Sequence, residues 1–158
     1  TLAGSSAASD VYKRQDIAPV IAACRNMSQS KTGALIVIKR NNSLEFVKSS
    51  GDAMSVAVNQ PILESIFYKN SPLHDGAMLI EGNTITATRV ILPVSDDKKI
   101  PLRFGLRHRA AVGVSEKSDA VCLVVSEENG QISYLKDGDF VLYETLEQLT
   151  EIIHKDLS

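Results

Sequence analysis

The sequence has little of what marks several large classes of protein. It contains no tryptophan, its aromatic residues amount to 5% of the chain, and its formal net charge is −2. Nucleic-acid-binding surfaces usually combine a basic patch with aromatic side chains for base stacking, so this composition does not favour RNA or DNA as a partner. No apolar run approaches the roughly 18 residues needed to span a bilayer. We therefore expect the chain as given to be soluble.

Cysteine is scarce as well. The two cysteines, Cys24 and Cys122, lie in apolar surroundings and form no C-x-x-C pair. This pattern is typical of buried free thiols in a reducing compartment.

Three common catalytic motifs are absent. The sequence has no G-x-x-x-x-G-K-[ST] motif, which argues against a P-loop fold, and no G-x-G-x-x-G after a strand, which argues against a dinucleotide-binding redox fold. Ser126 does not stand in a G-x-S-x-G elbow, and neither cysteine has a recognisable catalytic setting.

The length of 158 residues fits one domain with a full hydrophobic core. Residues 1–15 are small, polar and aperiodic, which predicts a disordered arm or a segment derived from cloning. The domain is expected over residues 16–158. Strands in pairs alternate with helices along it, which predicts an α/β (α+β) fold with a central mixed sheet flanked by helices.

Hydrophobic periodicity predicts the individual elements. Helices are expected over residues 16–27, 60–69, 107–115 and 144–157, with Asp16 as a cap of the first. Strands are expected over residues 33–38, 44–47, 77–80, 84–92, 120–125, 131–135 and 140–142, while residues 51–58 are compatible with a short strand. Asn41 and Asn42 mark a turn, so residues 44–47 are expected to pair with residues 33–38 as a hairpin.

The segment 71–77, with the sequence SPLHDGA, is the first candidate for chemistry. Pro72 disfavours helix at the preceding residue, and Gly76 relaxes the backbone after two ionisable side chains. The pattern predicts a tight loop that presents His74 and Asp75 at the start of a strand. An ordinary turn with solvated polar residues is the alternative interpretation.

Two further polar groups adjoin predicted elements. Arg107, His108 and Arg109 precede small apolar residues at a predicted helix start, where planar guanidinium groups and free backbone N–H groups suit phosphate oxygens. Ser126, Glu127 and Glu128 follow a buried strand and could hold a cation together with phosphates. A solvated charged turn and a hairpin tip are the respective alternatives. Together, the three groups supply the parts of a nucleotide-triphosphate site with a metal and a base.

Four blocks of sequence resemble the catalytic domain of bacterial diadenylate cyclases, in particular the membrane-anchored subfamily. The blocks are KTGALIVIKR at 31–40, SPLHDGA at 71–77, FGLRHRAAVGVSE at 104–116 and VVSEENGQIS at 124–133, and they occur in family order. The resemblance covers about residues 16–157 and implies that the protein joins two ATP molecules into cyclic di-AMP with release of two pyrophosphates.

The resemblance also implies roles for individual residues. Asp75 would help to deprotonate the ribose 3′-hydroxyl, and His74 and Glu128 would bind a divalent cation, Mn²⁺ or Mg²⁺. The nucleotide would be bound by Leu35 beside adenine, by Gly76 and Ala77 where it approaches the backbone, and by Arg107, His108, Arg109, Ser126 and Glu127 at the phosphates. Two positions depart from the family pattern: Leu106 replaces a common threonine, and Ile91 replaces an aromatic residue that some members stack on adenine.

Partners follow from the same resemblance. Each domain would bind one ATP, so that catalysis needs a homodimer that can be transient. Members of the subfamily carry transmembrane helices before the domain, and the full-length protein is expected at the cytoplasmic face of the bacterial membrane. A non-catalytic sensor of ATP or cyclic dinucleotide is the main alternative, but a sensor has no use for the acid at Asp75. An RNA-binding module that uses the arginine cluster is the other alternative.

Overall fold

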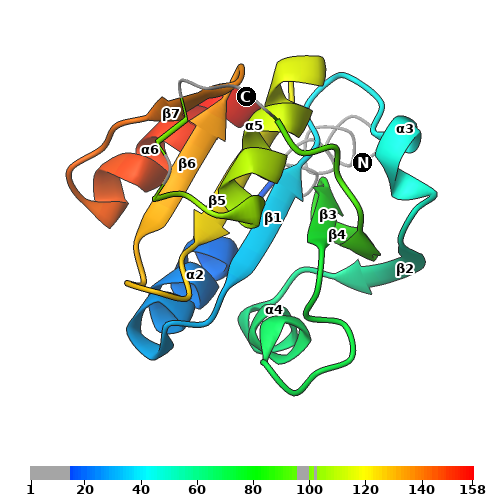
Figure 1. Ribbon diagram of the computed structural model, residues 1–158, viewed down its shortest axis with the longest axis horizontal. Helices are drawn as coiled ribbons and strands as arrows, with labels where there is room; N and C mark the ends of the chain where they lie inside the picture. The colour runs from blue at the N-terminus through cyan, green and yellow to red at the C-terminus, as the bar shows by residue number, and fades with distance from the viewer. Residues whose placement is uncertain (1–14, 96–99, 102) are drawn as a thin grey trace, which may run out of the picture.

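One mixed β-sheet organises the chain. The computed structural model describes residues 15–95, 100–101 and 103–158, and its elements are shown in Figure 1. The helices are α2 (Ala18–Ser30), α3 (Glu45–Lys48), α4 (Gln60–Phe67), α5 (Leu106–Lys117) and α6 (Leu146–Leu157). The strands are β1 (Ala34–Ile38), β2 (Asp52–Ala57), β3 (Ala77–Glu81), β4 (Thr84–Val90), β5 (Val121–Val125), β6 (Ile132–Lys136) and β7 (Asp139–Val141).

The strands form one sheet in the order β2-β4-β3-β1-β5-β6-β7. Strands β1 and β3 are parallel, and all the other neighbouring strands of the described sheet are antiparallel. The predicted mixed sheet and single domain are therefore confirmed. The strand at the centre, β1, is buried at every position, as expected of the continuous apolar run from which it is built.

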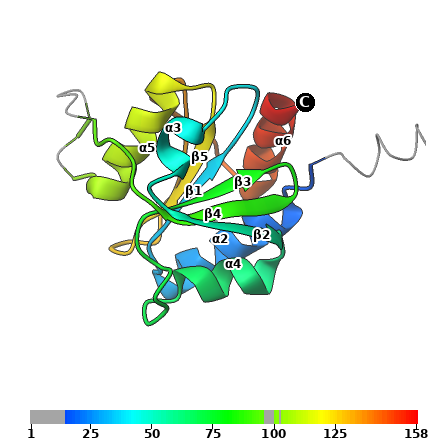
Figure 2. The same cartoon turned by 90° about the vertical axis from the view of Figure 1, so that its right-hand side faces the viewer.

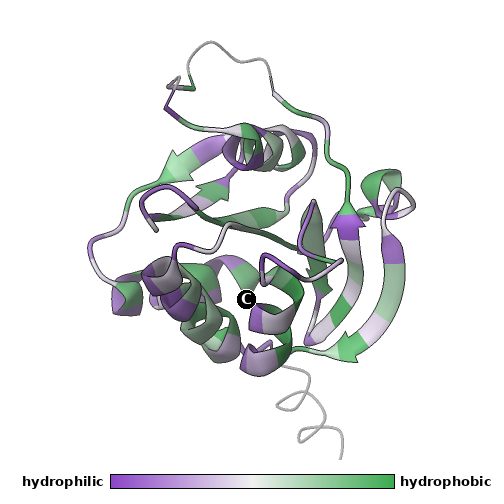
Figure 3. Cartoon of the chain, turned by 60° about the horizontal axis from the view of Figure 1, so that its bottom comes forward, coloured by the Kyte–Doolittle hydropathy of each residue, from purple (hydrophilic) through white to green (hydrophobic). Residues whose placement is uncertain are grey.

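Helices cover both faces of this sheet, and side chains alternate between them because successive residues of a strand point to opposite faces. Ile36 and Ile38 pack on the side of α2, α4 and α6, whereas Leu35 and Val37 pack on the side of α5 and α3. Figure 2 shows the two helical layers edge-on. In Figure 3 hydrophobic residues make up much of the strands, while the helices carry both hydrophobic and hydrophilic residues.

One predicted strand is wrong. Residues 44–47 do not form a hairpin with β1 but contribute to the short helix α3. Leu44 and Val47, three residues apart, are both buried in the core on the α5 side, which is a helical spacing. The preceding turn is held elsewhere, because the carboxylate of Asp119 accepts hydrogen bonds from the backbone N–H groups of Asn41 and Asn42. The neighbours of β1 are consequently β3 and β5.

The other predicted elements are found, with ends shifted by a few residues. The hairpin of β3 and β4 has its turn at residues 82–83. The predicted cap is shifted, because Ile17 stands at the N-cap of α2, while the carboxylate of Asp16 just before it accepts a hydrogen bond from the N–H of Ala18. Cys24 and Cys122 are buried free thiols. Residues 1–14 of the predicted arm lie outside the described residues. Among the helices that the structure describes, none has the length and hydrophobicity that crossing a bilayer requires.

Candidate functional site

Three of the predicted site segments lie along one edge of the sheet. Ala34 of β1 pairs with Val125 of β5, and β3 runs parallel to β1 with Ile36 opposite Met78. The start of β1, the start of β3 and the end of β5 therefore lie side by side. Neighbouring strands are about 4.8 Å apart, so the segment before β3 and the segment after β5 are separated by roughly 10 Å across β1. The predicted acid and the predicted phosphate-binding groups are thus brought to the same edge.

The loop before β3 is held by its own hydrogen bonds. The hydroxyl of Ser71 accepts a hydrogen bond from the N–H of Leu73, and Nδ1 of His74 lies 2.7 Å from the Ser71 carbonyl oxygen. A carbonyl oxygen can only accept, so Nδ1 carries the hydrogen and Nε2 remains as the second ring nitrogen. This arrangement, in which one ring nitrogen donates to a carbonyl, is common among metal-binding histidines.

His74 and Asp75 are neighbours in space as well as in sequence. Nε2 of His74 lies 3.1 Å from Oδ1 of Asp75, whose side chain is 81% exposed. Two atoms that both carry lone pairs repel each other at this distance unless a proton or a cation lies between them. Gly76 follows with φ of +76°, and a β-carbon there would lie 2.8 Å from backbone atoms of Arg89 and Val90. Glycine is therefore required for this loop to pass close to the end of β4.

The second group lies where α5 begins. Arg107 is the second residue of this helix, and its guanidinium lies so close to residue 33 that a β-carbon on Gly33 would be 2.8 Å from Cζ. Nη1 of Arg107 lies 3.5 Å from Oε1 of Glu127. Gly105, which caps the helix, provides no side chain for the first backbone N–H groups. These groups and Arg107 offer hydrogen-bond donors to an anion.

The turn after β5 faces these donors. The hydroxyl oxygen of Ser126 accepts hydrogen bonds from the N–H groups of Glu128 and Asn129 at 3.1 and 3.4 Å. Its own hydrogen takes part in neither bond and can be donated to a ligand. The side chains of Glu127 and Glu128 are exposed.

A hollow of about 280 Å³ lies between the start of α5 and the turn after β5, and we call it the arginine hollow. It is lined by Arg103, Phe104, Gly105, Leu106, Arg107, His108, Val125, Ser126, Glu127, Glu128, Asn129 and Gln131. Four predicted nucleotide-binding residues thus come together with the predicted metal ligand Glu128. Arg109 and Leu35 do not line this hollow. Leu35 is buried in the core on the α5 side, and Arg109 lies half-buried on α5.

His108 is a buried wall of the arginine hollow. It is 6% exposed, and its ring centroid lies 4.7 Å from that of Phe104 and 6.3 Å from that of Phe140. Burial, helped by the charge of Arg107, lowers its pKa to about 4, so the ring is neutral at neutral pH. Among the described residues, its Nε2 has no hydrogen-bond partner. This nitrogen is itself buried, so His108 shapes the wall of the hollow and does not present Nε2 to its interior.

A second hollow of about 290 Å³ lies beside the loop before β3 and the end of β4, and we call it the aspartate hollow. It is lined by Ser50, Gly51, Asp52, Asp75, Gly76, Arg89 and Ile91. Sequence patterns do not indicate Asp52 or Arg89, since nothing in a strand-like segment marks which residues meet across the sheet. Of the predicted metal pair, Glu128 lines the arginine hollow and His74 lies in the loop before β3, and their sharing one ion stays a prediction.

Comparison with known proteins identifies the family. Residues 21–140 match the family model described as "DisA bacterial checkpoint controller nucleotide-binding". The chain belongs to this family.

Relatives and solved structures agree with this assignment. The chain is 45% identical over 124 residues to diadenylate cyclase CdaS of Bacillus thuringiensis, with 78% of the chain and 61% of that protein covered. It is 35% identical over 144 residues to cyclic di-AMP synthase CdaA of Bacillus subtilis, with 91% and 53% covered. The crystal structure of a double mutant of DacA from Staphylococcus aureus superposes with a TM-score of 0.85 at 41% identity, covering 89% of the chain and 94% of that structure. The chain thus spans little more than half the length of these curated relatives.

The two departures from the family pattern both lie at the hollows. Leu106 lines the arginine hollow and Ile91 lines the aspartate hollow, and their exposed fractions of 74% and 72% are high for apolar side chains. Exposed apolar side chains beside polar groups are suited to contact a planar base or a second protein surface.

Proposed function

We propose that this chain is a diadenylate cyclase, which condenses two ATP molecules into cyclic di-AMP and releases two pyrophosphates. One observation supports this most: the exposed carboxylate of Asp75 and the donors of the arginine hollow lie at the same edge of the sheet, on either side of the start of β1. A nucleotide laid across this edge can meet both. The family and the names of the relatives point to the same reaction.

The triphosphate is bound in the arginine hollow. Arg107, the first N–H groups of α5 and the hydroxyl of Ser126 supply donors from three directions. Charge-assisted hydrogen bonds from a guanidinium are stronger than those between neutral groups, so Arg107 contributes most to binding.

Asp75 acts at the 3′-hydroxyl of the ribose. Its carboxylate accepts the hydroxyl proton as the 3′-oxygen forms a bond to the α-phosphorus of the other ATP, while the bond from that phosphorus to the bridging oxygen breaks and pyrophosphate leaves. The 3′-hydroxyl of the second nucleotide then attacks the α-phosphorus of the first in the same way, with loss of the second pyrophosphate, and this closes the ring. Asp75 is suited to this role because its side chain is exposed, and because Gly76 lets its loop pack tightly against the end of β4, which holds the carboxylate in place.

A divalent cation, Mn²⁺ or Mg²⁺, completes the site. His74 fits such an ion, because its Nδ1 is held by a carbonyl and its Nε2 faces a carboxylate oxygen at 3.1 Å. Within the described residues no group of three or more His, Cys, Asp or Glu side chains is arranged to hold a metal. This suits an ion that takes most of its ligands from substrate phosphates, as Mg²⁺ and related ions do in nucleotide enzymes. When bound, it would neutralise phosphate charge in the transition state.

Two copies of the chain supply the two nucleotides. One domain has one arginine hollow and one Asp75, so each hydroxyl must attack the phosphate held by a partner across a two-fold axis. Membrane anchoring is part of the same proposal, through helices outside this chain, as the family resemblance implies.

The reaction is tested directly by incubating the protein with ATP and Mn²⁺ or Mg²⁺ and separating the products by chromatography. We expect cyclic di-AMP and pyrophosphate. ADP as the only product, or intact ATP under both metals, would refute the proposed reaction.

A further inference from the structure

The aspartate hollow is lined by a positively charged side chain, Arg89, to which the proposed reaction gives no role. Arg89 lies in this hollow together with Asp75 and Asp52. Its side chain is 50% exposed, and its Nε lies 2.5 Å from Oδ2 of Asp52. The arrangement places an accessible guanidinium on the side of the site where the 3′-hydroxyl would react.

The backbone presents Arg89 in an unusual way. Its φ is +54°, in the left-handed region that residues other than glycine, asparagine and aspartate seldom adopt. The pairing between β3 and β4 shifts register at this point, between the Ala77–Val90 and Leu79–Ala87 pairs. Such bulges re-aim a side chain and are frequent next to active sites. A residue kept in this conformation is a reason to look for a function.

The conformation of Arg89 is coupled to the loop of the predicted base. Gly76 packs so closely on the Arg89 backbone that a β-carbon on residue 76 would lie 2.8 Å from the Arg89 carbonyl carbon. Hydrogen bonding and the charge of Asp52 raise the pKa of Arg89, and the charge of Asp75 contributes further. The backbone of Arg89 is therefore packed against the loop that carries Asp75, and the two side chains attract each other.

The ion pair between Arg89 and Asp52 does not by itself explain why Arg89 is kept in this unusual conformation. Both side chains are about half exposed, and exposed ion pairs contribute little to stability. The pair uses Nε of the guanidinium, whose two terminal nitrogens carry four further N–H donors. These donors lie in one plane, which suits two oxygens of a phosphate.

We propose that Arg89 binds a nucleotide phosphate on the Asp75 side of the site, and that Asp52 holds the guanidinium in place for it. This rests on the proposed function and deepens it, because it adds a phosphate contact outside the arginine hollow. The phosphate belongs either to the nucleotide bound by the same chain or to the one brought by the opposing chain. Both have the same chemistry, and the test below separates them.

The test compares three variants with the wild-type chain. Arg89→Gln removes the charge, Arg89→Lys keeps it without the planar donors, and Asp52→Asn removes only the partner of the ion pair. Loss of a charge-assisted contact to phosphate corresponds to roughly a tenfold to hundredfold loss. We expect Arg89→Gln to lower cyclic di-AMP formation by that factor, Arg89→Lys to lower it less, and Asp52→Asn to lower it by no more than about threefold. Arg25→Gln, an exposed arginine on α2, controls for the change in net charge.

Binding of a non-hydrolysable ATP analogue to the dilute, monomeric chain assigns the phosphate. Weaker binding by Arg89→Gln means that the phosphate belongs to the chain's own nucleotide. Unchanged binding with lost turnover means that it belongs to the nucleotide of the opposing chain.

A purely structural Arg89 predicts a different pattern. If the pair only joins β2 to β4, Arg89→Gln and Asp52→Asn lower the thermal unfolding temperature and the activity equally. That result, or a fully active Arg89→Gln protein, would overturn the inference. Wild-type protein that forms no cyclic di-AMP would refute the proposed reaction instead, so the two failures are distinct.

Discussion

The guanidinium of Arg107 lies against Gly33, so closely that a β-carbon on residue 33 would be 2.8 Å from Cζ and Nη1. The start of the central strand thus sets the position of the arginine that begins α5. We expect Gly33→Ala to push the guanidinium away from Glu127 and to weaken ATP binding about tenfold, because a displaced charge loses its aligned contacts to phosphate. Titration of an ATP analogue measures this.

Gly105→Ala is the matched control for the Gly33 variant. A β-carbon on residue 105 meets no atom of the described residues within 4 Å, although it too would lie at the arginine hollow. It should cost about 1 kcal/mol or less as a change of helix cap and should leave binding nearly intact. Equal binding losses in the two variants would mean that Gly33 has no special relation to Arg107.

Asp75 should affect turnover and not binding. Asp75→Asn keeps the shape of the side chain but removes the charge that accepts the proton, so we expect turnover to fall by about two orders of magnitude or more. Binding of ATP should largely survive. Arg107→Ala should instead weaken the binding of ATP itself. The control for Asp75→Asn is Asp139→Asn, at an exposed position on β7. An Asp75→Asn protein with wild-type turnover would remove this residue from the mechanism.

His74 should influence the choice of metal. Its imidazole is oriented by the Ser71 carbonyl, and imidazole nitrogen favours Mn²⁺ and other transition metals over Mg²⁺, which prefers oxygen ligands. We expect His74→Ala to lower Mn²⁺-dependent activity more than Mg²⁺-dependent activity. A proportional loss with both metals would indicate that the ring only supports the loop. His154→Ala, on the distant helix α6, is the control.

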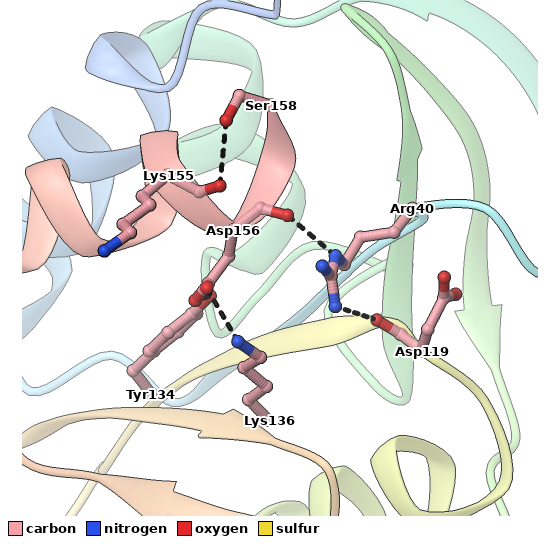
Figure 4. Close-up of polar contacts among 7 residues, drawn as sticks. All are labelled: Arg40, Asp119, Tyr134, Lys136, Lys155, Asp156 and Ser158. Carbon is pink, nitrogen blue, oxygen red and sulfur yellow. Dashed lines mark hydrogen bonds and ion pairs between the residues drawn. The ribbon is translucent and has the colours of Figure 1, made fainter.

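Contacts of Asp156 on the C-terminal helix α6 should stabilise the fold at neutral pH and lose this effect in acid. In Figure 4 the carboxylate of Asp156 meets Tyr134 at 2.7 Å and Lys136 at 2.8 Å, and its backbone carbonyl accepts a hydrogen bond from Arg40. Burial alone would raise the pKa of Asp156, but hydrogen bonds from Lys136 and Tyr134 outweigh it, and the pKa is lowered. A lowered pKa gives stability that is present above the ordinary value near 4 and is lost as pH falls through the folded-state value.

The variant Asp156→Asn tests this. At neutral pH it should lower the unfolding free energy by about 1–3 kcal/mol, since it removes a charged acceptor from two donors. The difference from wild type should shrink as pH falls below about 4. Denaturant unfolding at several pH values measures it. Glu151→Gln, an exposed position on the same helix, should show no such pH dependence.

Sequence patterns predicted the fold best where burial is continuous. The run that forms β1 and the run that forms β5 have no polar residue to make their interpretation ambiguous, and both are buried strands. The strand prediction for residues 44–47 failed because four residues with three apolar positions fit a strand and a helix turn equally well. Only contact with the core decides between them, and that contact is not local.

The sequence indicates candidate site residues where a segment carries its own polar motif, and not where the candidate depends on pairing across the sheet. The groups around Asp75, Arg107 and Ser126 stand out as polar residues at element ends. Arg89 and Asp52 do not, because Arg89 reaches the hollow beside Asp75 through a register shift between β3 and β4, and Asp52 reaches it through the pairing of β2 with β4. A bulge of this kind results from tertiary packing and leaves no composition signal in a single sequence.

The last prediction concerns the need for two chains. In the proposed reaction each hydroxyl reaches a phosphate that another copy holds, so specific activity should rise with protein concentration until the dimer saturates. A contact lined by arginines, carboxylates and triphosphates is a poor permanent interface, so the isolated chain can be monomeric when dilute. Measuring cyclic di-AMP formation over a hundredfold range of concentration, alongside the oligomeric state, tests this.

Mixing wild-type protein with the Asp75→Asn variant tests the same prediction independently. A dimer of wild type with Asp75→Asn retains one base and can complete only one of the two bonds. At saturating dimer and a fourfold excess of the variant, cyclic product per wild-type chain should fall to about one fifth, because random pairing leaves few wild-type dimers. The linear intermediate with one new bond should accumulate in its place. Specific activity that is independent of concentration, in a chain that stays monomeric and is insensitive to the variant, would require both bonds to form on one domain.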